Sequence, residues 1–262
     1  MSQPLRPVNH AQDDSVLDYS IVVPAYNEEK LLPATLRTLR EAMNGASSER
    51  QGEIIVVDNN STDTTADIAR QAGVRVVFEP INRISRARNT GAREACGCHL
   101  IFVDADTHVP PALLTGSLDA LLHQDVGAGG ALLQFDEDGP IGFSTSRLPQ
   151  LWNRLSRNLR LAAGSYLFAR RDAFEAVGGF SEKVYAGEEI FISQALKRWC
   201  RRNRKTFRIL TEPPVLTSAR KLKWHSPARL LAVILLPALF PFLLCSKRFC
   251  SFWYVRPELP PD

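Results

Sequence analysis

The sequence predicts an α/β fold in which a mainly parallel, Rossmann-like sheet is flanked by helices and followed by an apolar helical segment. Short apolar runs alternate with segments of helical periodicity between residues 19 and 210, as in βαβ units. Several runs are apolar at every position, which is typical of strands buried on both faces of a parallel sheet. The 262 residues are 45% hydrophobic and 23% charged, which excludes a disordered or fibrous chain.

The first half of the chain predicts four strands with helices between them. The first strand, over 19–24, precedes a helix that has Asn27 as its N-cap and repeats leucines at helical spacing. A second helix is capped by Ser61 or Thr62 and closed by Gly73. The remaining elements are strands over 53–58, 74–78 and 99–104 and a helix over 83–97.

The second half predicts a less regular alternation. A helix begins at Pro110 or Pro111, and the strand-like run over 126–135 is irregular because it contains three glycines. The further elements are helices over 147–162, 172–177 and 188–202 and strands over 165–169 and 206–210. The chain shows no internal repeat and no long linker, so we expect three parts: a flexible tail over 1–17, one folded domain over 18–222, and an apolar segment over 223–262.

Positive charge is concentrated near the C-terminal end of the predicted domain. The net charge is +4, but residues 197–223 contain ten Lys and Arg and one acid, a local balance of +9. An uncharged run over 230–245 follows, and basic residues beside an apolar run are what an anionic membrane surface attracts. A nucleic-acid partner is not expected, because the basic block lacks interleaved aromatic side chains.

The apolar run predicts a peripheral membrane contact through residues 224–254. Its sixteen uncharged residues fall short of the ~20 needed to span a bilayer, and Pro237 and Pro241 interrupt it. Trp224, Trp253 and Tyr254 flank it, as aromatic residues do at membrane interfaces. The competing interpretation is a helix that packs on the folded domain.

Cysteine number and the N-terminal sequence predict a cytoplasmic protein on the cytoplasmic face of a membrane. Five cysteines are an odd number in a chain too long to need disulfides, which indicates a reducing compartment. The first 14 residues lack the apolar stretch of a secretory leader.

Polar residues follow three of the predicted strands, where ligands bind in open α/β sheets. These loops begin at Pro24, Asp58 and Asp104. Each loop alone is explained by helix capping and turn formation, but all three together favour a binding site. Asp104 and Asp106 project to one face if the strand end stays extended, and a hard divalent ion with substrate phosphates would relieve their repulsion.

Five motifs in fixed order carry a resemblance to a known family. They are Ile-Val-Val-Pro-Ala-Tyr-Asn-Glu at 21–28, Val-Val-Asp-Asn-Asn-Ser-Thr-Asp at 56–63, Ser-Arg-Ala-Arg-Asn-Thr-Gly at 85–91, Phe-Val-Asp-Ala-Asp at 102–106, and Val-Gly-Gly-Phe at 177–180 followed by Gly-Glu-Glu at 187–189. Over residues 19–220 the chain resembles a family-two nucleotide-sugar glycosyltransferase of the inverting, GT-A type.

The resemblance implies a UDP-sugar donor, a divalent metal and a set of site residues. The uridine would be held by Pro24, Ala25, Tyr26, Glu28 and Asp58, and Arg88 would lie near the donor's phosphates. Asp104 would face the ribose and the metal, and Asp106 would ligate Mg²⁺ or Mn²⁺. Glu188 and Glu189 stand where the family has Glu-Asp, whose second member is the catalytic base. The longer second carboxylate here leaves open which of the two is the base. Without the resemblance, acids at a helix start are explained by the helix dipole.

The sequence thus predicts an enzyme that moves one sugar, with inversion, from a UDP-sugar to an acceptor hydroxyl or phosphate. The basic block and the arginines over 147–171 point to a lipid-linked acceptor. Two alternatives stay open. A sugar-phosphate nucleotidyltransferase would carry a glycine-rich basic loop after the first strand, where 24–29 has neither glycine nor base. A non-catalytic nucleotide-sugar-binding, membrane-associated protein would not need the four acids at 104, 106, 188 and 189.

Overall fold

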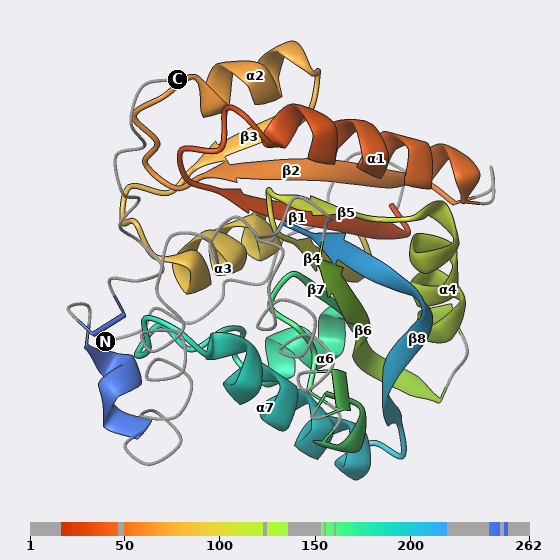
Figure 1. The fold of residues 1–262 in the computed structure, drawn as a ribbon. Helices are drawn as coiled ribbons and strands as arrows, with labels where there is room; N and C mark the ends of the chain where they lie inside the picture. The colour runs from red at the N-terminus through yellow and green to blue at the C-terminus, as the bar shows by residue number, and fades with distance from the viewer. Residues whose placement is uncertain are drawn as a thin grey trace, which may run out of the picture.

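The computed structural model describes residues 17–46, 50–122, 125–135, 153–154, 156–159, 161–218, 241–246 and 249–250 (Figure 1). The strands are β1 (Tyr19–Ala25), β2 (Gly52–Asp58), β3 (Arg75–Phe78), β4 (His99–Val103), β5 (Thr107–His108), β6 (Val126–Phe135), β7 (Tyr166–Arg170) and β8 (Thr206–Thr217). The helices are α1 (Leu32–Gly45), α2 (Thr65–Gln71), α3 (Ile84–Glu94), α4 (Pro111–Leu122), α6 (Arg171–Ala176), α7 (Glu188–Arg202) and the 3₁₀ helix η1 (Pro241–Cys245).

The described strands form one sheet in the order β3-β2-β1-β4-β7-β6-β8-β5. The pairs β3-β2, β2-β1, β1-β4 and β6-β8 are parallel, whereas both pairings of β7 and the short β5-β8 pairing are antiparallel. The expected α/β fold with a mainly parallel sheet is confirmed. The parallel half matters for function, because β1, β2 and β4 all end at the same edge.

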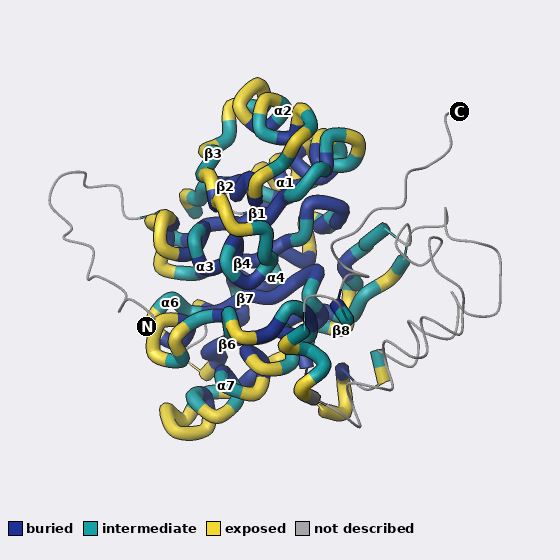
Figure 2. Tube along the Cα trace, turned by 90° about the vertical axis from the view of Figure 1, so that its left-hand side faces the viewer, coloured by how far each residue is buried: buried dark blue, intermediate teal, exposed yellow. Residues whose placement is uncertain are grey.

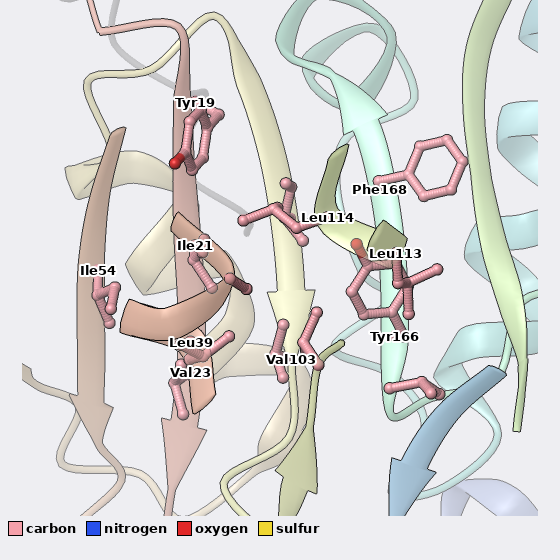
Figure 3. Packing of buried hydrophobic residues seen from close by; sticks show 14 of the residues in the cluster. Tyr19, Ile21, Val23, Leu39, Ile54, Val103, Leu113, Leu114, Tyr166 and Phe168 are labelled. Carbon is pink, nitrogen blue, oxygen red and sulfur yellow. The ribbon is translucent and has the colours of Figure 1, made fainter. Parts of the chain in front are cut away.

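Helices cover both faces of the sheet, and a hydrophobic core lies under each layer (Figures 1 and 2). Along β1, Ile21 and Val23 point into the core beneath α1 and α4, while Val22 points into the core beneath α3, α6 and α7. Figure 3 shows the first of these cores, where Tyr166 and Phe168 of β7 lie beside leucines of α4. This two-sided burial is the reason that the strand sequences are apolar at every position.

Strand β8 runs to Thr217, seven residues beyond the predicted end at residue 210. This longer strand contains two prolines, which cannot donate to a ladder hydrogen bond. The register accommodates them: Ala131 of β6 pairs with Leu210, and Leu133 pairs next with Val215. The prolines at 213 and 214 therefore lie in a bulge where no ladder hydrogen bond is required.

Two predicted helix caps are wrong for one shared reason. Helix α1 starts after Leu31 rather than Asn27, and α2 starts after Thr64 rather than after Ser61 or Thr62. The Asn27 amide side chain instead pairs with Thr62, whose backbone N–H donates to Asn27 Oδ1 at 2.8 Å. The polar side chains that were expected to cap these helices instead join the loops after β1 and β2. Gly73, by contrast, follows α2 in the left-handed conformation, with φ of 68°, as predicted.

Several predictions fall partly or wholly outside the described residues. These are the tail over 1–17 except its last residue, most of the helix over 147–162, and the apolar segment except residues 241–246 and 249–250. Residues 153–154 and 156–159 of the predicted helix are helical. Within the part of the chain that the structure describes, no helix is long and apolar enough to cross a bilayer.

Candidate active site

The loops after β1 and β2 are joined by hydrogen bonds at the carboxyl edge of the sheet. The backbone N–H of Asn27 donates to Ser61 Oγ at 3.0 Å, and that of Glu28 donates to Thr65 Oγ1 at 2.7 Å. Asn27 adopts a φ of 52°, which asparagine tolerates better than most residues. The two loops therefore form one continuous rim rather than two independent turns.

The residues expected to hold the nucleoside all lie on this rim. Pro24 and Ala25 are the last two residues of β1, and Ala25 is in register with Asp58 at the end of β2. Asp58 is buried and accepts a hydrogen bond from the Ser61 N–H at 2.9 Å. Tyr26 is half-buried and Glu28 is buried in the loop that follows. The structure thus brings these five positions together.

The loop from Asp104 to Asp106 stands next to this rim, at the end of β4. Thr107 N–H closes a turn by donating to the Asp104 carbonyl at 3.1 Å, and Thr35 Oγ1 of α1 donates to the Ala105 carbonyl at 2.8 Å. The Asp104 side chain is 20% exposed, and Asp106 is buried. Helix α1 and the turn thereby hold the backbone of the loop that carries both carboxylates.

Arg88 connects the Asp104 loop to the start of α7. Its side chain is 1% exposed, and one guanidinium nitrogen, Nη1, donates to Glu188 Oε1 at 2.7 Å. The other, Nη2, donates both to Asp104 Oδ1 and to the Gly164 carbonyl at 2.7 Å. A planar guanidinium suits this forked arrangement, which an ammonium group would not reproduce. Arg88 was expected near the donor's phosphates, and in this structure its two terminal nitrogens are bonded to Asp104, Glu188 and Gly164.

Helix α3 also positions the loop that leads to Glu188. Asn89 donates to the Phe180 carbonyl and accepts from the Phe180 N–H, both at 2.9 Å. Gly179 has a φ of 72°, and a Cβ atom there would lie 2.7 Å from Asn89 Oδ1. Gly187, with φ of 73°, begins α7 and leaves Glu188 and Glu189 in its first turn. The glycines of this motif are therefore required by backbone conformation and by close approach.

The two glutamates have raised pKa values. Burial raises the pKa of Glu188, and Asp104 adds to this effect, while Arg88 opposes it. The pKa of Glu189 is raised to about 8, first by burial and then by the negative charge of Glu188. A Cβ atom on Gly164 would lie 3.8 Å from Glu189 Oε2, so this carboxylate stands beside the Arg88 cluster. A half-buried carboxylate with a pKa near neutrality is suited to accept a proton.

Asp104 and Asp106 have the oxygen ligands that hard divalent ions prefer. The described residues contain no group of three or more His, Cys, Asp or Glu arranged to hold an ion. Asp104 and Asp106 are two carboxylates on one short loop, and Mg²⁺ is commonly held by one or two carboxylates plus substrate phosphates. The pair can therefore supply two of the oxygen ligands of such an ion.

Some residues of this site carry no sequence signal. Gly164 lies 76 positions from Arg88, and nothing in its neighbourhood predicts that its carbonyl accepts from the guanidinium. Leu244 of η1 is a second case, because its carbonyl accepts from the Tyr185 N–H at 2.7 Å and its side chain lies beside Gly187. The described part of the C-terminal segment thus packs on the domain, next to the start of α7.

Sequence comparisons relate this chain to known proteins. The sequence profile described as Glycosyl transferase family 2 matches residues 20–178. The glycosyltransferase AglE of Haloferax volcanii is 26% identical over 185 residues, which span 65% of this chain and 58% of AglE. Validoxylamine A glucosyltransferase of Streptomyces hygroscopicus subsp. limoneus is 35% identical over 107 residues, which span 38% of this chain and 23% of that enzyme.

Solved structures show the same fold. Glucosyl-3-phosphoglycerate synthase from Mycobacterium tuberculosis, in complex with Mg²⁺ and UDP, superposes with a TM-score of 0.61 at 17% identity, covering 92% of this chain and 81% of that one. S. aureus TarS 1–349 with UDP-GlcNAc gives a TM-score of 0.58 at 20% identity, covering 77% and 58%. The structure has the GT-A architecture, and the profile match extends over more than half of the sequence. The chain belongs to glycosyl transferase family 2.

Proposed function

We propose that this protein is an inverting glycosyltransferase that moves one sugar from a UDP-sugar to an acceptor hydroxyl or phosphate. The observation that carries the proposal is the position of Arg88, which bonds Asp104 on one side and Glu188 on the other. The loop from Asp104 to Asp106 and the start of α7 are thereby held in one cluster, beside the rim formed by the loops after β1 and β2. The family match supports transfer chemistry.

Asp104 and Asp106 would hold the diphosphate end of the donor through a divalent ion. Mg²⁺ or Mn²⁺ held by Asp104 and Asp106 together with the phosphates would stabilise the negative charge of the leaving diphosphate. Arg88 orients Asp104, because its guanidinium donates directly to Asp104 Oδ1. The rim from Pro24 to Glu28, with Asp58, orients the uridine.

Glu189 is the base that we assign to the reaction. The acceptor oxygen forms a bond to the anomeric carbon as the bond from that carbon to the diphosphate oxygen breaks, and the acceptor proton passes to Glu189. Attack from the side opposite the diphosphate inverts the anomeric configuration. A pKa of about 8 places Glu189 where base catalysis is efficient, worth about 10²–10⁴ in rate. Glu188 is the less suitable base because its carboxylate is already bonded to Arg88.

Structures of the same fold support a nucleotide-sugar donor without fixing the base. TarS 1–349 was solved with UDP-GlcNAc, and a mannosyltransferase from Pyrobaculum calidifontis, with a TM-score of 0.58 at 23% identity, was solved with GDP-Man and Mn²⁺. The mannosyltransferase alignment covers 81% of this chain and 60% of that one. Uridine is our assignment, and guanosine is the alternative that the assay must separate.

The acceptor that we propose is lipid-linked, reached on the cytoplasmic face of a membrane. The supporting features are the basic block over 197–223, the uncharged run over 230–245, and the membrane contact expected through 224–254. The chain spans 58% and 23% of the two curated relatives described above, so their acceptors are not transferred to it.

Nucleotide release from a panel of UDP- and GDP-sugars with Mn²⁺ tests the proposal. We expect UDP release from one donor, with E189Q at least about 100-fold slower and nucleotide affinity unchanged. Glu175 is an exposed acid on α6, so E175Q is a matched control that should retain full activity. Pyrophosphate production from a sugar phosphate and UTP would favour the nucleotidyltransferase, and binding without turnover would favour the non-catalytic protein.

A further inference from the structure

Exposed arginines gather at the C-terminal end of α7 and on a neighbouring segment, of which residues 153–154, 156–159 and 161–162 are described. The segment lies against α7, because Lys197 Nζ donates to the Leu159 carbonyl at 2.6 Å and Ala162 N–H donates to Ser193 Oγ at 3.1 Å. We call this surface the basic face. Its members are Arg154, Arg157, Arg198, Arg201, Arg202 and Arg204, all of which are exposed.

The basic face is not neutralised by neighbouring acids within the described part of the chain. No Asp or Glu occurs between residues 190 and 210, and none of the six arginines forms an ion pair with another described residue. The helix dipole explains a preference for Arg201 and Arg202 in the last turn of α7. It does not explain Arg154 and Arg157, which lie on another segment. Six unneutralised cations on one surface are a feature of anion-binding proteins.

Exposed apolar side chains lie along α7 and on the two segments that contact it. Phe191 is 40% exposed, and the spacing 191, 194, 198, 202 places it on the same side of α7 as Arg198 and Arg202. Leu159, which is 50% exposed, lies next to Lys197 on the neighbouring segment. Phe242, 68% exposed, is on η1, which contacts the loop at the start of α7 (Figure 1). Figure 2 shows the exposed residues along α7.

We propose that the basic face is an attachment surface for an anionic lipid bilayer, in addition to any contact made by residues 224–254. A bilayer fits better than a nucleic acid, because Phe191 and Leu159 can enter the head-group region while the arginines contact lipid phosphates. The inference does not rest on the reaction proposed above. The basic face and the glutamates at 188 and 189 lie at opposite ends of the same helix, α7.

Co-sedimentation of the full chain with vesicles tests the proposal. We would compare phosphatidylcholine vesicles with vesicles containing 30% phosphatidylglycerol, for the wild type and for the triple variant R198Q/R201Q/R202Q. With about a fivefold contribution from each arginine near the surface, the variant should lose on the order of 100-fold in partitioning onto the anionic vesicles. The binding of the wild type should weaken as salt is raised.

A second triple variant, R37Q/R70Q/R93Q, is the matched control. It removes the same charge from exposed positions on α1, α2 and α3, none of which belongs to the basic face. An equal loss in both triple variants, or no loss in the first, would overturn the proposal, provided that both variants keep the urea unfolding midpoint of the wild type. Tighter binding to a single-stranded RNA oligonucleotide than to the anionic vesicles, under the same salt, would overturn the assignment to lipid.

Discussion

Replacing Arg88 by methionine removes the buried cation that Asp104 and Glu188 share. Methionine keeps the aliphatic volume, but Glu188 loses its partner and Asp104, which is 20% exposed, loses a charged hydrogen bond. Removing one member of a buried ion pair costs about 3–5 kcal/mol, because the remaining charge stays desolvated. For a domain whose total stability is of order 5–15 kcal/mol, R88M should lower the urea midpoint strongly.

The loss should depend on pH with a definite sign. Burial already raises the pKa of Glu188 above its unfolded value, and without Arg88 it rises further. The folded state then retains a proton that the unfolded state releases, so the stability of R88M falls as pH rises above about 4.5. The destabilisation should be smaller at pH 5 than at pH 8.

Urea unfolding followed by circular dichroism measures both quantities. The double variant R88M/E188Q removes the stranded charge and should recover at least about 1 kcal/mol relative to R88M at pH 8. The reasoning about Arg88 fails if R88M unfolds within about 0.5 kcal/mol of the wild type, or if its loss is the same at pH 5 and pH 8.

Three further variants test other parts of the site by the same unfolding assay and, for the last, by UDP binding. G179A should cost at least about 1 kcal/mol more than G178A, because both positions have positive φ but only the Cβ at 179 meets Asn89; equal losses would contradict this. E189Q should be more stable than the wild type at pH 9 by at least about 1 kcal/mol, and the two should be nearly equally stable at pH 5. The reason is that a Glu189 pKa of about 8 makes folding less favourable as pH rises from about 4.5 to 8. A wild type more stable than E189Q at pH 9 would exclude a raised pKa. T35V should lower the free energy of unfolding by about 1–2 kcal/mol, because it leaves the Ala105 carbonyl without its donor. It should also weaken UDP binding measured by calorimetry. An unchanged UDP affinity would show that Thr35 does not support the site.

The fold and the loops of the site could be predicted because local signals and global structure agree. Residues 21–23 are apolar at every position, and both faces of β1 are in fact buried. Polar residues after β1, β2 and β4 share one sheet edge as a consequence of parallel pairing. The order of motifs then identified the family.

The helix starts, the partners of Arg88 and the extent of β8 depended on contacts that sequence spacing does not encode. Asn27 is a residue type that often caps helices, but its side chain pairs with Thr62, 35 positions away. Arg88 had an expected place near phosphates, yet its partners are a carbonyl at 164 and an acid at 188, which only the folded chain brings together. The bulge that accommodates the prolines of β8 was likewise set by pairing with β6.

The most direct test of the central claim is calorimetric titration of UDP into the wild type and D106N, each with and without Mn²⁺. The claim is that the rim after β1 and β2 and the carboxylates at 104 and 106 bind one metal-bridged nucleoside diphosphate. It predicts that Mn²⁺ tightens UDP binding to the wild type by at least about tenfold, or about 1.4 kcal/mol, and that D106N loses this gain. Equal UDP affinity with and without the metal, in both proteins, would contradict it.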